Sequence, residues 1–574
     1  MGKFLLGLLT GLLLVFLVLV LIFFAAWHFR DRPPEIADNS VLVLRLGGEI
    51  PEKPPLDMPA FLGGGHPGLT VTGFWMTLRK AAVDSHIKAV VLEPEKLAAG
   101  WAKLEEMRAD LDRFRKSGKP VYAYLRTPGA REYYLATAAD RIYLGGSDLV
   151  MLRGMRAELM FFKKTLDKLG VVVEVEHAGK YKDYGDMFTR SDMSAETRDV
   201  MNLLVDDLYA NVVAKIAAGR KKTPDEVRSI VDQGPFTATQ AQKAGLVDAL
   251  KYEDEMWGEL KDRLKTGEPH KVALDDYLKV PAEAVGLGGK SRIALVVAEG
   301  DIVRGNAGDN GADESKLTSY GFNKLLRKVR NDATIQGVIV RIDSPGGEEV
   351  ASDEMWREMS LLSRKKPLVI SMSDVAASGG YDMAMTGDPI VAYPQTETGS
   401  IGVVFGKPNL HGLYDKLGIT KDAVQRGKHA DVESDYTPLT PEEREMLRRG
   451  IDESYRDFVN RVATARHRTF DQVEPLAQGR VWLGDQAKER GLVDELGGLD
   501  TAIDLVKQKA RIPAAERVSL VIYPSRRSIV DVLLRRGTDD PLETRLAQVF
   551  GRVPFHAWMK GGMLRVMPYW VTVQ

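Results

Sequence analysis

Two halves of the chain repeat one pattern. Four segments of the first half recur in the second at separations of 246 to 248 residues, and the matching pairs begin at Ile87 and Ile335, at Lys119 and Lys366, at Leu169 and Leu417, and at Gln242 and Lys488. Chance matches would scatter in their separation, so the near-constant value indicates a duplication. A chain of 574 residues would otherwise suggest about four domains. The repeat instead predicts two copies of one fold, flanked by shorter segments.

Each copy places four short apolar segments between amphipathic or charged ones. The apolar segments are 41–46, 89–92, 121–125 and 141–144 in the first copy, and 293–297, 337–342, 368–372 and 389–392 in the second. Strands that alternate with helices form βαβ units and parallel sheets. Almost wholly apolar strands are typical of a sheet that is covered on both faces. The sequence therefore predicts an α/β fold with parallel-rich sheets.

An uncharged apolar run lies near the start of the chain. It extends from Phe4 to Trp27, and at about 1.5 Å per residue it would span the roughly 30 Å hydrocarbon core of a bilayer. The run is longer than the apolar part of a typical signal peptide, and no convincing small-residue cleavage motif follows it. We therefore expect one N-terminal transmembrane helix. The expected domains are a membrane anchor (1–33), a first repeat (34–285), a second repeat (286–515) and a C-terminal extension (516–574).

Composition excludes several classes of function. The 79 basic and 80 acidic side chains leave a formal net charge of −1, so no nucleic-acid partner is expected. The chain has no cysteine, which excludes disulfides, thiolate-bound zinc, iron–sulfur clusters and a thiol nucleophile. The sequence has no metal-ligand spacing and no Walker-type phosphate loop. We therefore expect neither a metal nor another cofactor.

A candidate nucleophile follows the third strand of the second copy. The run Val-Ala-Ala-Ser-Gly-Gly-Tyr places Ser378 between small residues that would leave it accessible, ahead of a segment with a helical pattern. At such a helix start, the N–H of Gly379 could bind a developing oxyanion. An ordinary helix N-cap is a common use of serine, and it explains this run better when the run is taken alone.

A second glycine-rich loop shifts the balance. Asp-Ser-Pro-Gly-Gly at 343–347 follows the preceding strand, and the pair Gly346 and Gly347 would let a substrate approach the backbone closely. By itself this run could be a simple Pro-Gly turn. Neighbouring parallel strands, however, end on the same side of a sheet. We therefore expect both loops to converge where ligands bind in open α/β sheets.

The two copies have lost complementary residues. The position equivalent to Ser378 in the first copy is Ala130, whereas Lys182 of the first copy corresponds to Ala430 of the second. This pattern suggests one composite site, in which a buried Lys182 with a lowered pKa serves as general base for Ser378. A solvated loop lysine and a histidine base are the alternatives. A nearby Asp183 would count against the lysine, because a carboxylate keeps an amine charged.

Together these motifs resemble the long, membrane-anchored form of the bacterial signal peptide peptidase A family, which has a Clp-protease/crotonase-like fold. The matching runs are Asp-Ser-Pro-Gly-Gly at 343–347, Ala-Ala-Ser-Gly-Gly-Tyr at 376–381, Thr-Gly-Ser-Ile-Gly at 398–402 and Gly-Lys-Tyr-Lys at 179–182. The tandem halves and the apolar N-terminal run match as well. The resemblance extends from this run to about residue 510.

The resemblance implies a Ser/Lys dyad of Ser378 and Lys182, with Ser400 helping to orient the lysine. It implies that the oxyanion donors are the backbone N–H groups of Gly379 and of the pair Gly346 and Gly347. It further implies a homotetramer anchored in the lipid of the bacterial inner membrane, with its catalytic domain on the extracytoplasmic side. The implied activity is the hydrolysis of cleaved signal peptides and other apolar peptides.

Two departures from the family pattern affect this interpretation. Asp382 stands where an uncharged residue is expected, and a carboxylate there could trim specificity or repel acidic substrates. Residues 93–96 of the first copy are unusually polar. Two other functions stay open, namely an acyl-coenzyme A hydratase-like enzyme on the same fold and an inactive scaffold that binds membrane partners. Loss of proteolysis in Ser378→Ala would separate a peptidase from a scaffold.

Overall fold

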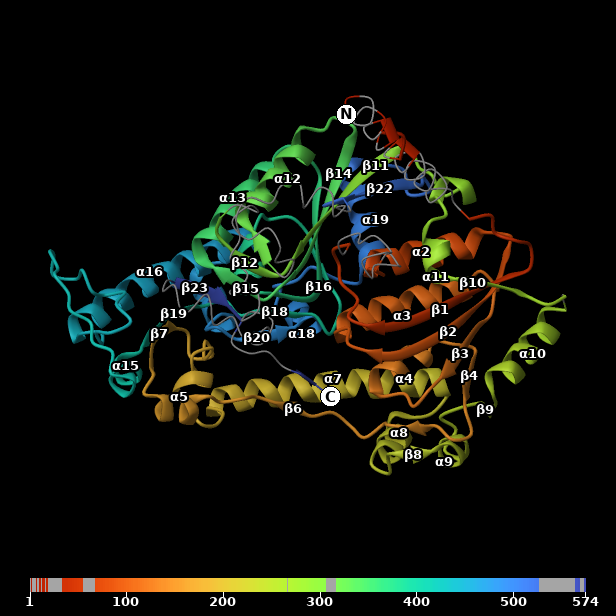
Figure 1. The fold of residues 1–574 in the computed structure, drawn as a ribbon, viewed down its shortest axis with the longest axis horizontal. Coiled ribbons are helices and arrows are strands. Elements are labelled where there is room, and N and C mark those ends of the chain that lie inside the picture. Colours follow the sequence, from red (N-terminus) through yellow and green to blue (C-terminus); the bar gives the residue numbers. More distant parts are fainter. Residues whose placement is uncertain are drawn as a thin grey trace.

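The structure is a computed structural model that describes residues 34–54, 68–265, 267–305, 316–525, 563–567 and 572–573, and scattered residues between 2 and 18. Within this part of the chain, each copy forms an α/β unit around its own sheet, and a third sheet joins the two units (Figure 1).

The first copy is built on a sheet of six parallel strands, which confirms the predicted strand segments. Its spatial order is β10 (His270–Ala273), β1 (Ser40–Gly48), β2 (Ile87–Leu97), β3 (Val121–Leu125), β4 (Arg141–Leu144) and β9 (Ala249–Leu250). The central strands have side chains buried on both faces, as the absence of apolar–polar alternation predicted.

Ten helices accompany this sheet in the described part of the first copy. They are α2 (Val71–Val83), α3 (Trp101–Arg115), α4 (Ala130–Ala136), α5 (Lys163–Leu169), α6 (Asp186–Thr189), α7 (Ala195–Arg220), α8 (Pro224–Val231), α9 (Ala238–Lys243), α10 (Glu253–Leu264) and α11 (Leu274–Leu278). The long helix α7 begins where Ser194 accepts a hydrogen bond from the Thr197 N–H, a normal N-cap. It contacts α4 of its own copy and also reaches the second copy (Figure 1).

The second copy repeats this arrangement. Its main sheet has the order β20 (Val481–Leu483), β18 (Glu397–Gly399), β16 (Leu368–Ala377), β14 (Ile335–Ser344), β11 (Ser291–Glu299) and β22 (Val518–Tyr523). In addition, β17 (Ile390–Ala392) pairs with β16, and β21 (Glu495–Leu496) pairs with β17. All these pairs are parallel except β18 with β20. Strand β22 pairs with β11 as β10 pairs with β1, so each sheet ends in an equivalent strand.

The helices of the second copy are α12 (Ser319–Asn331), α13 (Glu349–Ser363), α14 (Gly379–Met383), α15 (His411–Leu417), α16 (Pro441–Ala465), α17 (Phe470–Val473), α18 (Gly484–Glu489) and α19 (Leu499–Ala510). Helix α16 begins with a capping box between Thr440 and Glu443 around Pro441. These residues satisfy the first free N–H groups and set the backbone for a helix, so the sequence dictates where α16 starts.

A third, mixed sheet connects the two copies. Its order is β13 (Lys316–Thr318), β12 (Asp301–Val303), β15 (Gly346–Glu348), β23 (Met563–Val566), β19 (Val403–Asn409) and β7 (Val172–Ala178). Strand β7 belongs to the first copy and pairs antiparallel with β19 of the second over seven residue pairs. The shared sheet therefore holds the end of β7, and the loop after it, against the second copy.

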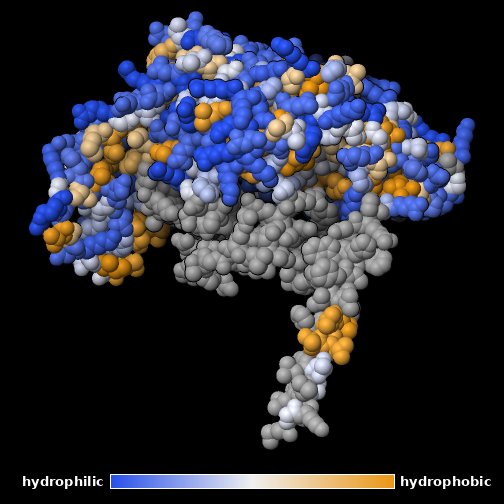
Figure 2. All heavy atoms as spheres, turned by 90° about the horizontal axis from the view of Figure 1, so that it is seen from above, coloured by the Kyte–Doolittle hydropathy of each residue, from blue (hydrophilic) through white to orange (hydrophobic). Residues whose placement is uncertain are grey.

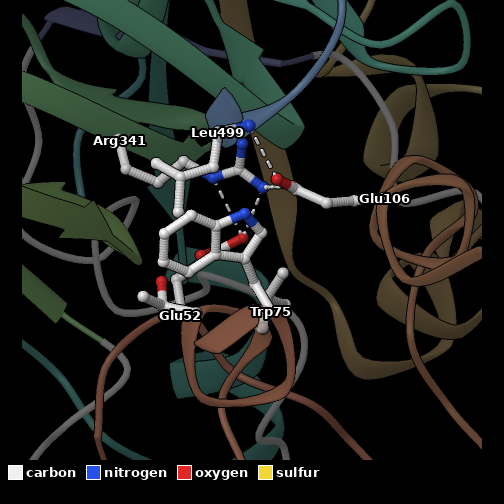
Figure 3. A pocket seen from close by; sticks show the side chains of 7 residues that line it. Glu52, Trp75, Glu106, Arg341 and Leu499 are labelled. Carbon is white, nitrogen blue, oxygen red and sulfur yellow. Dashed lines mark hydrogen bonds and ion pairs between the residues drawn. The ribbon is translucent and has the colours of Figure 1, made fainter. Parts of the chain in front are cut away.

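A buried ion cluster connects the two copies at a second place, away from the shared sheet (Figure 3). The Arg341 guanidinium of the second copy lies 2.9 Å from Glu52 and also pairs with Glu106, both from the first copy. All three side chains are at most 3% exposed. Burial alone would lower the pKa of Arg341, but these two carboxylates raise it above its usual value. The arginine therefore stays charged and paired across the boundary between the copies.

The predicted N-terminal anchor (1–33) lies mostly outside the described residues. Its described residues are helical, and Leu13, Leu14 and Val15 are each more than half exposed. Figure 2 shows a small orange, hydrophobic group that stands apart from the main body of the molecule. No described helix is both long and apolar enough to cross a membrane. The transmembrane helix stays a prediction.

The C-terminal extension contributes strands to three different sheets. Beyond β22 in the second copy and β23 in the shared sheet, β24 (Thr572–Val573) pairs with β6 (Ala157–Glu158) of the first copy. The extension therefore runs along the body of the molecule at the described positions.

A further short strand pair lies within the first copy, where β5 (Leu149–Val150) pairs with β8 (Phe236–Thr237).

Candidate active site

Ser378 lies at the turn between β16 and α14, where the sequence placed it. Its φ of 54° and ψ of −114° are unusual for a residue with a side chain, and such strain is often found at functional turns. The hydroxyl makes no capping hydrogen bond to α14, so the simple N-cap explanation does not describe this serine. Gly380 permits the turn because a Cβ there would lie 2.7 Å from the Ser344 carbonyl oxygen.

Ser378 is not accessible in this structure, so the expected exposure is wrong. Its relative exposure is 0%, although its neighbours are as small as the sequence indicated. The physical reason is that β23 covers the adjoining turn. A Cβ on Gly379 would be 3.1 Å from the carbonyl oxygen of Arg565 in that strand.

Lys182 of the first copy reaches Ser378 of the second. Its Nζ lies 2.7 Å from Ser378 Oγ and 2.9 Å from both the hydroxyl and the carbonyl oxygen of Ser400. The lysine follows β7, so the β7–β19 pairing brings it to the second copy. Gly479 lies close to its backbone, because a Cβ there would be 2.6 Å from the Lys182 nitrogen. The two residues that the repeat comparison paired are therefore in hydrogen-bond contact within one chain.

The surroundings of Lys182 favour its neutral form. Complete burial lowers the pKa of Lys182 well below its usual value, and the positive charge of Arg565 lowers it further. Asp183 opposes this shift, but its carboxylate accepts a hydrogen bond from Thr197. Burial raises the pKa of Asp183 itself to about 7. The carboxylate of Asp183, which the sequence analysis counted against a neutral Lys182, is therefore only a weak obstacle to it.

Ser400 stands just beyond β18, in the left-handed region with a φ of 50°. Its backbone N–H donates to the Arg480 carbonyl at 2.7 Å, which fixes the turn. Both of its oxygens then face Lys182 Nζ. The structure thus brings Ser400 to the lysine, as the family resemblance implied.

The three glycines named from sequence gather at one point. Gly346 and Gly379 are so close that a Cβ on Gly346 would lie 2.7 Å from the Gly379 nitrogen. Gly347 is in register with Arg565. The N–H of Gly346 donates to the Ser344 hydroxyl at 3.2 Å, which leaves the N–H groups of Gly347 and Gly379 as the better placed donors for an oxyanion.

The sequence analysis missed Arg565, and it noted Asp382 without identifying the cation that pairs with it. Asp382 is completely buried, and its carboxylate accepts from Arg461 at 3.0 Å and from Arg565 at 2.5 Å. Arg565 lies beyond the repeat, 183 residues from Asp382, so no motif or offset points to it. The departure at Asp382 was a usable signal, because a buried carboxylate requires a cation.

The histidine alternative gains no support from the described residues. None of their histidine rings has a hydrogen bond to Ser378, and the ring of His177, at the end of β7, contacts the Gly179 carbonyl instead.

Comparison with known proteins identifies the family to which the chain belongs. Residues 113–266 and 360–513 each match the model of "Peptidase family S49", and together these spans cover more than half of the chain. The chain belongs to peptidase family S49. It is a serine protease, and the two matches begin 247 residues apart, which agrees with the duplication found in the sequence.

Several relatives of this S49 protease match over most of their length. "Serine protease SPPA, chloroplastic" from Arabidopsis thaliana is 36% identical, with 88% of this chain and 74% of the relative covered. "Protease 4" from Haemophilus influenzae is 31% identical, covering 86% and 83%, and "Protease 4" from Salmonella typhi is 32% identical, covering 80% and 74%. The resemblance to the signal peptide peptidase A family is confirmed.

Proposed function

We propose that this S49 protease hydrolyses peptide bonds with Ser378 as nucleophile and Lys182 as general base. The observation that carries the proposal is the 2.7 Å contact between Lys182 Nζ and Ser378 Oγ, in a site where both side chains are completely buried. A neutral amine can accept the serine proton, whereas an ammonium cannot. Burial and the nearby Arg565 favour the neutral amine.

The chemistry follows from the contacts of the amine. A neutral Lys182 has two N–H groups and one lone pair. When its N–H groups donate to the Ser400 hydroxyl and carbonyl oxygens, the lone pair faces Ser378. Ser378 Oγ then attacks the peptide carbonyl carbon while its proton moves to Lys182. The resulting ammonium gives this proton to the leaving amine, and an acyl group stays on Ser378.

Deacylation uses the same groups in reverse. Lys182 takes a proton from water, the hydroxide oxygen attacks the acyl carbon, and Ser378 regains its proton as the product acid leaves. In both steps the negative oxygen would be held by the backbone N–H groups of Gly347 and Gly379. Such fixed donors are usually the largest single contribution to catalysis of acyl transfer.

Substrate and location complete the proposal. A relative that is 30% identical over 41% of this chain is named "Putative signal peptide peptidase SppA", from Enterococcus faecium, and we propose cleaved signal peptides and other apolar peptides as substrates. The uncharged run from Phe4 to Trp27 supports attachment to lipid as a single-pass protein of the bacterial inner membrane. The catalytic domain would lie on the extracytoplasmic side as a homotetramer.

The test is proteolysis of a fluorogenic signal-peptide analogue by the full chain in detergent. Ser378→Ala and Lys182→Met should each abolish cleavage, while Lys180→Ala, which changes an exposed lysine two residues away, should retain it. Unchanged cleavage in Ser378→Ala would contradict the proposal. No cleavage by the wild-type chain, with intact folding, would favour the scaffold or the hydratase-like enzyme.

A further inference from the structure

The shared sheet contains a position for one strand that the repeats themselves do not fill. Strand β23 lies between β15 and β19 and is antiparallel to both. It comes from the C-terminal extension, not from either repeat (Figure 1). Without it, β15 and β19 would present two facing edges one strand apart. Such edges bind an extended peptide through main-chain hydrogen bonds.

The register sets β23 directly across the candidate oxyanion donors. The Met567 N–H donates to the Pro345 carbonyl at 2.8 Å. In an antiparallel ladder the hydrogen-bonded pairs alternate, so the next such pair is Arg565 with Gly347. A Cβ on Gly346 would collide with the Arg565 carbonyl oxygen. This carbonyl therefore lies beside Gly347 and Gly379, whose N–H groups the proposed mechanism assigns to the oxyanion.

The Arg565 side chain enters an acidic pocket beside this point. Its guanidinium lies 2.5 Å from Asp382 on α14 and 2.9 Å from Glu349 on α13. It also contacts the carbonyl and hydroxyl oxygens of Ser454 at 3.4 and 3.3 Å, and lies over the Phe458 ring at 4.8 Å. The arginine is 3% exposed.

The charges of the pocket require a cation from outside the repeats. Asp382 is fully buried and Glu349 is 18% exposed. The other cation that contacts Asp382 is Arg461, which is shared with Asp353. If Arg565 left, Asp382 would have to share Arg461 with Asp353, and Glu349 would keep only its contact with the Ser454 hydroxyl. Because an unpaired buried carboxylate is strongly unfavourable, an apolar side chain is a poor replacement and a basic one is a good replacement.

We infer that this pocket selects an arginine or lysine side chain in the substrate residue whose carbonyl Ser378 attacks, and that β23 occupies it as a tethered stand-in for substrate. The inference rests on the proposed function of Ser378. It explains why Asp382 replaces an uncharged residue at this position. It also narrows the expected substrates from apolar peptides in general to those with a basic residue at the cleaved bond. The bound cation would help keep Lys182 neutral, as Arg565 does.

The test measures kcat/KM of the full chain on four fluorogenic peptides, acetyl-Ala-Leu-Xaa-aminomethylcoumarin with Arg, Lys, Leu or Glu at Xaa. We expect the Arg and Lys peptides to exceed the Leu peptide by at least about tenfold, as for a buried charge pair. Asp382→Asn should bring the Arg-to-Leu ratio close to one. Since this change also affects Arg461, Glu349→Gln is the second variant, and it should lower the same ratio while leaving the Asp382–Arg461 pair in place.

Labelling of Ser378 by a fluorophosphonate separates the two proposals. Suppose that Ser378 is labelled and required for cleavage, but that kcat/KM is equal for the Leu and Arg peptides in the wild type and in both variants. The acidic pocket is then not a specificity site. If Ser378 is neither labelled nor required, the proposed function fails instead.

Vacating the pocket gives an independent test. Arg565→Ala in the full chain should raise kcat/KM for the Arg peptide several-fold, because the competing strand is weakened. Arg565→Lys keeps the positive charge, so it should raise kcat/KM less than Arg565→Ala does. Arg511→Ala, which changes an exposed arginine, should leave kcat/KM close to wild type. A fall in activity in Arg565→Ala would mean that β23 supports the site, and it would overturn the inference that substrate takes its place.

Discussion

The substitution Ser400→Ala is the sharpest single test of the proposed dyad. Lys182 Nζ contacts three oxygens, namely Ser378 Oγ at 2.7 Å and the Ser400 hydroxyl and carbonyl at 2.9 Å each. Ser400→Ala removes one of these three and keeps the other two. The amine would lose the second partner that directs its lone pair toward Ser378. We therefore expect a loss in kcat and little change in KM.

The size of the loss follows from the burial of the site. All three residues are completely buried, and a buried N–H that loses its acceptor raises the free energy by about 1–3 kcal/mol. If the whole difference acts on the transition state, kcat should fall by about 5- to 150-fold. The carbonyl of Ser400 stays in place, so the loss should be smaller than in Lys182→Met.

The assay is steady-state cleavage of the fluorogenic signal-peptide analogue, with thermal unfolding measured on the same samples. Ser371→Ala is the matched control, because this buried serine in β16 accepts from Arg341 at 2.9 Å and has no contact with Lys182. It should keep its kcat even if it lowers stability. A kcat in Ser400→Ala within twofold of wild type, or a change confined to KM, would refute the orienting role.

Three other changes test the same account. In Lys182→Met, kcat should fall by at least about a hundredfold; calorimetry should find the variant more stable at neutral pH, with a gap that narrows toward pH 10, because the lowered pKa makes folding release a proton at neutral pH. Gly479→Ala should lower both kcat and the melting temperature, since its Cβ would meet the Lys182 backbone; Gly118→Ala has a similar φ of 83° and open space, so it should retain kcat. Arg341→Met should destabilise the chain by about 3–5 kcal/mol, because Glu52 and Glu106 would be left unpaired. Denaturant unfolding should show a smaller loss at acidic pH, where the two carboxyl groups can take up protons, and an equal loss at pH 5 and pH 8 would contradict this explanation.

The sequence predicted most of the framework because its signals are local. Apolar runs such as 41–46 and 293–297 became central strands β1 and β11, since an apolar run between helical segments can be buried on both faces only inside such a sheet. The pairing of Lys182 with Ser378 was also predictable. The first copy keeps the lysine and lacks the serine, whereas the second copy keeps the serine and lacks the lysine. This pattern can be read without knowing the fold.

What the sequence did not reveal depends on contacts between distant segments. No spacing rule links Arg341 to Glu52, 289 residues away, because that ion pair exists only once the copies have docked. The burial of Ser378 was missed for a similar reason, since β23 comes from outside the repeat. Asp382 was noticed as unusual, but its partner Arg565 could be found only in three dimensions.

The central claim is that one active site is assembled from both copies, with Lys182 activating Ser378. The most direct measurement is the rate at which a fluorophosphonate labels Ser378 in the full chain, followed from pH 5 to pH 10. The wild-type rate should rise with pH through a single pKa below the usual lysine value, and in Lys182→Met the rate should be low and lose this dependence. The same pH dependence in both proteins would contradict the account, because another group would then be activating the serine.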